Sequence, residues 1–168
     1  DMPGTSGIDP VHLLQDLIHC PSVTPIEAGV LDVIVTALEP LGFTCTRLRF
    51  EGDGSYAVDN LFATRGTGGK HLLFAGHTDV VPPGDGAAWR HLPFAAEIVD
   101  GVLYGRGAAD MKSGIAAFVA AVSRITPTGT VSFAITNDEE AEAINGTEKL
   151  MAWAAAEGHR CDFAIVGE

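Results

Sequence analysis

The sequence predicts an α/β fold with a mixed, largely parallel sheet flanked by helices. Short apolar runs typical of strands alternate with segments of helical periodicity over most of the length. No internal repeat or low-complexity linker interrupts this alternation. The chain has 168 residues, of which 46% are hydrophobic, and this composition suits one globular domain with a substantial core.

The first third of the chain is predicted to form two helices and a strand. Asp9-Pro10 is typical of an N-cap followed by proline, and apolar residues recur at helical spacing over residues 10–19. A second helix is predicted to start at Thr24-Pro25, because apolar positions at helical spacing follow that pair. Residues 43–50 are rich in β-branched and aromatic residues, which favours a strand.

The remaining elements are predicted from apolar runs and from glycine punctuation. We expect strands at 60–64, 72–75, 131–135 and 163–166, a hairpin at 97–104, and helices at 112–125 and 147–156. A long loop with several prolines and glycines follows the strand at 72–75. Loops of this length in a compact domain are usually functional.

Four short motifs with acidic or imidazole side chains recur at intervals of roughly 30 residues, the length of one strand-helix-strand unit. They are His77-Thr78-Asp79, Asp110, Asp138-Glu139-Glu140 and Glu168. Most of them follow a predicted strand, so parallel strands would bring them to one edge of the sheet. One imidazole and several carboxylates form a ligand set for a divalent metal, with zinc favoured and cobalt or manganese as substitutes.

Each motif also has an ordinary explanation when it is taken alone. Asp110 precedes a predicted helix and could be its N-cap, and three adjacent acids often form a solvated loop. The functional interpretation is that Asp79, two residues from His77 in an extended segment, accepts the second imidazole N–H. In the acidic triplet, one glutamate would bind metal while its neighbour shuttles a proton.

Charge and cysteine usage exclude several classes of partner. The net charge of −12 argues against nucleic acid, whose binders carry basic patches. No apolar run approaches the ~20 residues that a membrane span needs. Cys20, Cys45 and Cys161 are widely spaced and form no CxxC pattern, which indicates free thiols in a reducing cytoplasm.

Longer stretches around the motifs carry a family resemblance over nearly the whole chain. They are Gly76-His77-Thr78-Asp79-Val80-Val81-Pro82-Pro83-Gly84, Leu103-Tyr104-Gly105-Arg106-Gly107-Ala108-Ala109-Asp110-Met111-Lys112, Thr136-Asn137-Asp138-Glu139-Glu140 and Val166-Gly167-Glu168. This pattern resembles the dinuclear zinc aminoacylase/carboxypeptidase family. The Pro-Pro-Gly and Ala-Ile-Asn-Gly-Thr stretches point within it to enzymes that remove succinate from N-succinyl-LL-2,6-diaminopimelate, in lysine and diaminopimelate biosynthesis.

The resemblance implies a role for each motif residue in a site with two zinc ions. Four side chains would hold the metals: His77 and Glu168 on the first ion, Glu140 on the second, and Asp110 bridging both. Asp79 would orient His77, and Glu139 would be the general base for metal-assisted hydrolysis of an amide. The resemblance also implies a cis peptide bond between Asp110 and Met111.

Family enzymes continue beyond the length of this chain, with a lid and dimerisation domain and a C-terminal catalytic segment. We therefore expect residues 1–168 to be the N-terminal portion of the catalytic domain. The later segment would supply a histidine to the second zinc, so the chain alone should have one tight and one weak zinc site and be poorly active or inactive. The full-length enzyme would be a homodimer that acts on a small N-acyl amino acid.

Three alternatives remain open at the level of sequence. The enzyme could be an acetylornithine deacetylase, a related deacylase or a dipeptidase. The chain could instead be a metal-binding module without chemistry of its own. Finally, it could be an acidic α/β fragment that binds no metal.

Overall fold

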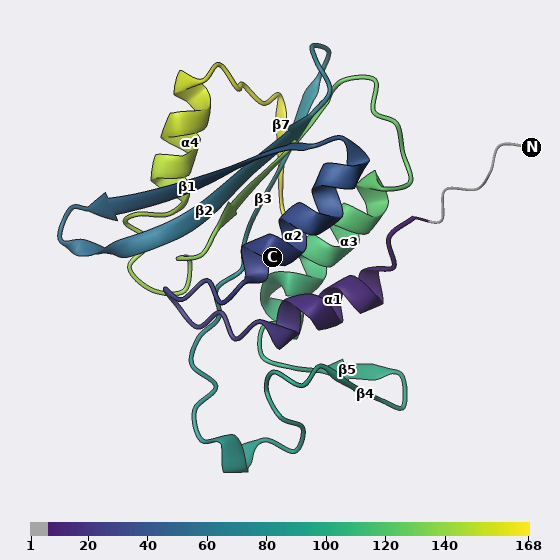
Figure 1. Ribbon diagram of the computed structural model, residues 1–168, viewed down its shortest axis with the longest axis vertical. Coiled ribbons are helices and arrows are strands. Elements are labelled where there is room, and N and C mark those ends of the chain that lie inside the picture. Colours follow the sequence, from purple (N-terminus) through teal and green to yellow (C-terminus); the bar gives the residue numbers. More distant parts are fainter. Residues whose placement is uncertain (1–6) are drawn as a thin grey trace, which may run out of the picture.

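A five-stranded mixed sheet forms the centre of the computed structural model, which describes residues 7–168 (Figure 1). Its strands are β1 (Thr44–Gly52), β2 (Ser55–Arg65), β6 (Thr130–Thr136), β3 (His71–His77) and β7 (Phe163–Val166), in this spatial order. Strands β6, β3 and β7 pair in parallel, and β2 pairs antiparallel with β1 and β6. Four of the five strands therefore run in one direction, which confirms the predicted sheet.

Helices cover both faces of this sheet (Figure 1). On one face lie α1 (Pro10–His19), α2 (Val30–Leu38) and α3 (Ser113–Val122), and on the other lies α4 (Thr147–Ala156). Successive strand residues point to opposite faces. Accordingly, Leu61 and Ala63 of β2 pack with the first three helices, whereas Phe62 packs with Leu150 of α4.

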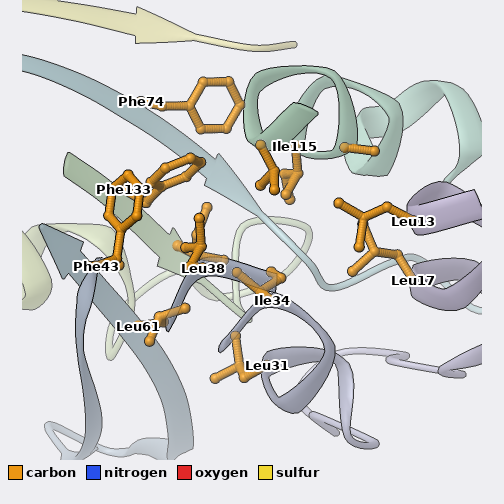
Figure 2. Close-up of a cluster of buried hydrophobic side chains, with 14 of the residues drawn as sticks. Leu13, Leu17, Leu31, Ile34, Leu38, Phe43, Leu61, Phe74, Ile115 and Phe133 are labelled. Carbon is orange, nitrogen blue, oxygen red and sulfur yellow. The ribbon is translucent and has the colours of Figure 1, made fainter. Parts of the chain in front are cut away.

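The larger core lies between the sheet and α1, α2 and α3 (Figure 2). Phe74 of β3 stacks on Phe118 of α3 at 4.7 Å between ring centroids. Phe133 of β6 meets Phe118 edge-on at 5.3 Å and Phe43 at 5.5 Å. Aromatic pairs of this kind add about 1 kcal/mol each beyond their buried area, so the cluster holds α3 firmly on β3 and β6.

The sequence predicted the start of α1 correctly and the start of α2 wrongly. Asp9 caps α1 by accepting the backbone N–H of Val11 at 3.0 Å. The second helix begins at Val30 rather than at Thr24-Pro25. Ala28 and Gly29 adopt left-handed backbone conformations, with φ of 54° and 83°, and no α-helix can pass through such a pair.

The remaining elements lie close to their predicted positions. The predicted hairpin forms from β4 (Glu97–Val99) and β5 (Val102–Tyr104), apart from the main sheet (Figure 1). Ahead of α3, residues 108–112 form an irregular turn rather than the first turn of an α-helix, because the backbone of Asp110 and Met111 is non-helical. In the described part of the chain, every helix is too short or too polar to cross a membrane.

Candidate metal centre

The predicted site residues meet at the edge of the sheet where β6, β3 and β7 end. His77 is the last residue of β3, Asp138-Glu139-Glu140 follows β6, and Glu168 follows β7. Ligand atoms of His77, Glu139 and Glu168 lie within 4.8 Å of one another, as do those of His77, Asp110 and Glu140. The fold thus brings together residues that are up to 91 positions apart in the sequence.

His77 is buried at the centre of this group. Its Nδ1 lies 3.0 Å from the backbone oxygen of Asp79, and its Nε2 lies 3.1 Å from Oδ1 of Asp110. When Nδ1–H donates to a carbonyl, Nε2 is left with the free lone pair that a metal needs. Burial alone would lower the pKa of His77, but the hydrogen bonds and the charge of Asp79 outweigh it and raise the pKa to about 9.

Asp79 is also buried, and its carboxylate organises three segments of the chain. It accepts Thr24 Oγ1 at 2.6 Å, the N–H of Glu139 at 3.0 Å and the N–H of Glu140 at 3.1 Å. Burial raises the pKa of Asp79, but the hydrogen bonds from His77, Thr24 and these amides lower it overall. The sequence predicted only the link to His77, whose Nδ1 lies 3.5 Å from Asp79 Oδ1.

Asp110 reaches the site from the irregular turn before α3. Its backbone is non-helical, and its peptide bond to Met111 is cis, as the family resemblance implied. Gly107 starts the turn with φ of 78°, and a Cβ there would lie 2.5 Å from Val80. Within the described residues, no side chain caps α3, so Asp110 is not the N-cap of this helix, which was its ordinary explanation from sequence.

Lys112 anchors the same turn to α1, a role that no sequence pattern predicted. It is fully buried, and its Nζ donates to the backbone oxygens of Leu17 at 2.7 Å and Cys20 at 3.1 Å. These carbonyls belong to the C-terminal end of α1, where a cation is favoured by the helix dipole. Burial lowers the pKa of Lys112 to about 8.

The carboxylates around His77 face one another with this imidazole as the cation among them. Burial raises the pKa of Glu140, and the negative charges of Asp110 and Glu139 raise it further, while the charge of His77 offsets part of the effect. The side chains of Asp110 and Glu139 remain 58% and 47% exposed. One imidazole nitrogen and several hydrated carboxylate oxygens match the ligand preferences of zinc, so the residues present fit such an ion.

A small cavity of about 140 Å³ opens at this edge of the sheet, and His77, Glu139 and Glu168 are among its lining residues. A larger hollow of about 620 Å³ lies between α1 and α2 and contains none of the predicted site residues. The volume of a cavity therefore does not identify the candidate site. The site is identified by the convergence of potential ligand atoms at the strand ends.

Comparison with known proteins supports a common origin for this arrangement. The model of peptidase family M20/M25/M40 matches residues 73–168. Succinyl-diaminopimelate desuccinylase of Rhodospirillum centenum is 56% identical over 165 residues, which cover 95% of this chain and 43% of that protein. The chain thus spans less than half the length of this relative.

Solved structures show the same fold. Human carnosine dipeptidase 1 superposes with a TM-score of 0.78 at 24% identity, over 94% of this chain and 38% of that protein. The M20 family metallo-carboxypeptidase Sso-CP2 from Sulfolobus solfataricus gives a TM-score of 0.78 at 21% identity, over 95% and 37%. The sequence match and the shared fold lead to one conclusion: the chain belongs to peptidase family M20/M25/M40.

Proposed function

We propose that the chain is the N-terminal portion of the catalytic domain of a zinc-dependent amide hydrolase. The substrate of the whole enzyme would be N-succinyl-LL-2,6-diaminopimelate, which it would cleave to succinate and LL-diaminopimelate. The observation that carries this proposal is the 56% identity to a succinyl-diaminopimelate desuccinylase over 95% of the chain. The convergence of one histidine and several carboxylates at the strand ends supports the metal-dependent chemistry.

The proposed centre holds two zinc ions, which cobalt or manganese could replace. His77 and Glu168 would hold the first ion, Glu140 would hold the second, and Asp110 would contribute to both. Support comes from the buried His77, whose Nε2 faces the Asp110 carboxylate. Within this chain the second ion has fewer ligands than the first, so a later segment would complete it.

Zinc, when bound, would polarise the scissile carbonyl and make a nearby water more acidic. Glu139 takes a proton from the attacking water as its oxygen bonds to the carbonyl carbon. Glu139 then delivers that proton to the amide nitrogen as the C–N bond breaks, which releases the amine. The Asp79 carboxylate accepts a hydrogen bond from the Glu139 N–H at 3.0 Å. This bond fixes the backbone of Glu139 and so determines where the Glu139 carboxylate can reach.

The proposal includes further chain beyond these residues, namely a lid and dimerisation domain and a C-terminal catalytic segment. The chain covers 43% of the desuccinylase that it matches. Phe163 and Val166 of the edge strand β7 are 62% and 64% exposed, as expected if further chain packs against this strand. The whole enzyme would be a homodimer. It would work in the cytoplasm, where the free Cys20, Cys45 and Cys161 stay reduced.

Steady-state kinetics of the full-length protein test the proposal. N-succinyl-LL-2,6-diaminopimelate should give a kcat/KM well above that for N-acetylornithine or a dipeptide. The variant Glu139→Gln should lose about 100- to 10,000-fold in kcat, because it removes the general base. Glu148→Gln, an exposed acid on α4, is the matched control and should keep full activity.

If N-acetylornithine is turned over faster than the succinylated substrate, the enzyme is an acetylornithine deacetylase and the proposed substrate is wrong. Full activity of Glu139→Gln would remove Glu139 from the mechanism. The 168-residue chain by itself should show no turnover, and measurable activity would refute the view that a later segment completes the site.

A further inference from the structure

A carboxylate that the proposed mechanism does not use lies buried beside the site. Asp138 directly precedes Glu139, yet it is 1% exposed, unlike the residues of a solvated acidic loop. Within the described residues, no lysine, arginine or histidine lies within salt-bridge distance of it, and its Oδ2 has no hydrogen-bond partner. A buried carboxylate without a cation depends on whatever hydrogen bonds it receives.

Asp138 receives its side-chain hydrogen bond from Tyr56 of β2. The Tyr56 hydroxyl donates to Asp138 Oδ1 at 2.7 Å across 82 positions of sequence. The same hydroxyl oxygen accepts the backbone N–H of Glu142 at 3.2 Å. One tyrosine oxygen therefore bridges the two ends of the segment that carries Glu139 and Glu140.

The rest of the β1–β2 hairpin tip holds Glu142 and the chain that follows it. Asn145 Nδ2 donates to the backbone oxygens of Gly52 at 3.2 Å and Tyr56 at 2.8 Å, and Ser55 Oγ donates to the Glu142 carboxylate. On the opposite side, the carboxylate of Asp79 accepts the amides of the two glutamates. The backbone between Asp138 and Glu142 is thus fixed from two sides.

We propose that Tyr56 is a positioning residue for Glu139 and Glu140, acting through Asp138 and the Glu142 amide. The inference rests on the proposed function, which makes these glutamates the base and a metal ligand. The Glu139 side chain is 47% exposed, so its own packing fixes it weakly and its place follows from the backbone. Without the Tyr56 hydroxyl, Asp138 would be buried with no side-chain donor and would move toward water, taking Glu139 with it.

The variant Tyr56→Phe removes one oxygen and keeps the ring. Tyr104→Phe is a matched control, because Tyr104 is the second of the two tyrosines in the chain and lies outside the network, stacked on His91. Affinity of the full-length protein for its second zinc, the ion assigned to Glu140, is measured by calorimetry with a competing chelator. Tyr56→Phe should bind this ion about 10- to 100-fold more weakly, as expected when a group that orients a ligand is lost, and Tyr104→Phe should match the wild type.

Amide hydrogen exchange of the metal-free chain, followed by NMR, provides a second measurement that needs no metal. In Tyr56→Phe, the amides of Glu139, Glu140 and Glu142 should exchange at least about tenfold faster, while those of β3 stay unchanged. In the full-length enzyme, the same variant should lower kcat and leave KM nearly unchanged, because Tyr56 acts through the backbone of the base and not on substrate.

The inference is overturned if the amides of Glu139, Glu140 and Glu142 exchange in Tyr56→Phe at the wild-type rate. It is also overturned if exchange is faster but zinc affinity and kcat are unchanged, because Tyr56 would then be structural only. Failure of the proposed function looks different. A wild-type chain that binds no zinc would contradict the metal assignment, and the exchange comparison would then decide alone whether Tyr56 holds the segment.

Discussion

Zinc binding by this chain should strengthen with pH because His77 must lose a proton to bind metal. In the metal-free protein the charge and hydrogen bonds of Asp79 raise the pKa of His77 to about 9. Below that pH each bound zinc displaces one proton, so the apparent affinity rises about tenfold per pH unit. Between pH of about 6.5 and 8.5 the gain is about 100-fold, or about 2.7 kcal/mol.

Calorimetry with a competing chelator at about pH 6.5, 7.5 and 8.5 measures this slope. Repeating the titration in two buffers with different heats of ionisation counts the released protons, and about one proton per zinc is expected at pH 7.5. The variant Asp79→Asn removes the charge that raises the His77 pKa. The pKa of His77 should then fall, because only the backbone hydrogen bond at residue 79 and the charge of Glu139 still oppose the effect of burial. The rise of zinc affinity with pH should therefore level off at a lower pH than in the wild type.

A wild-type affinity that is flat over this range, with no proton released, would refute the assignment of His77 as a ligand with a raised pKa. A slope that persists unchanged in Asp79→Asn would show that a different group titrates. A variant that binds less tightly and whose slope ends at a lower pH agrees with the argument, because Asp79 also orients the imidazole.

Two further variants test the supports of the site. Lys112 has a pKa of about 8 when folded and about 10.5 when unfolded, so the unfolded chain binds the extra proton between these values. The metal-free wild type should therefore gain up to about 3 kcal/mol relative to Lys112→Met as pH rises from 8 to 10.5, measured by urea unfolding, and parallel pH profiles would contradict this. In Gly114→Ala the new Cβ would lie 2.4 Å from the Gly167 oxygen, which should destabilise the chain by about 1–3 kcal/mol and weaken zinc binding by shifting Glu168. Gly86→Ala meets nothing within 4 Å and should behave as wild type in both assays, and a stable Gly114→Ala with wild-type zinc affinity would disprove the close contact.

Local patterns predicted most of the fold because most elements obey local rules. Helical periodicity and apolar runs located most helices and strands, and Asp9-Pro10 marked the start of α1. Strand β2 is longer than predicted, because it begins at Ser55 rather than at residue 60. The start of α2 was wrong because Ala28 takes a left-handed conformation. Alanine rarely adopts that conformation, so the residue type at position 28 did not predict a break in the helix.

The site was predictable to the extent that its residues follow strands. His77 and the acidic triplet lie directly after apolar runs, and parallel pairing then brings them together. Their supports come from elsewhere: Thr24 lies 55 positions from Asp79, and Lys112 lies 95 positions from Leu17. A buried lysine also contradicts the usual preference of lysine for the surface, so only the tertiary structure reveals it.

The burial of the site residues follows from which carboxylates receive protein hydrogen bonds. Asp79 can be buried as an anion because a hydroxyl, two amides and an imidazole surround its oxygens. Among the described donors, Asp110 and Glu139 face only the Nε2 of His77, at 3.1 and 3.8 Å, and stay half-exposed, where water solvates their charge. A cation that binds here therefore displaces water and the Nε2 proton of His77, while the imidazole is already oriented by its neighbour. Burying Asp110 without a metal would leave its charge unpaired, so a fold that keeps this edge open when metal-free avoids a cost of several kcal/mol.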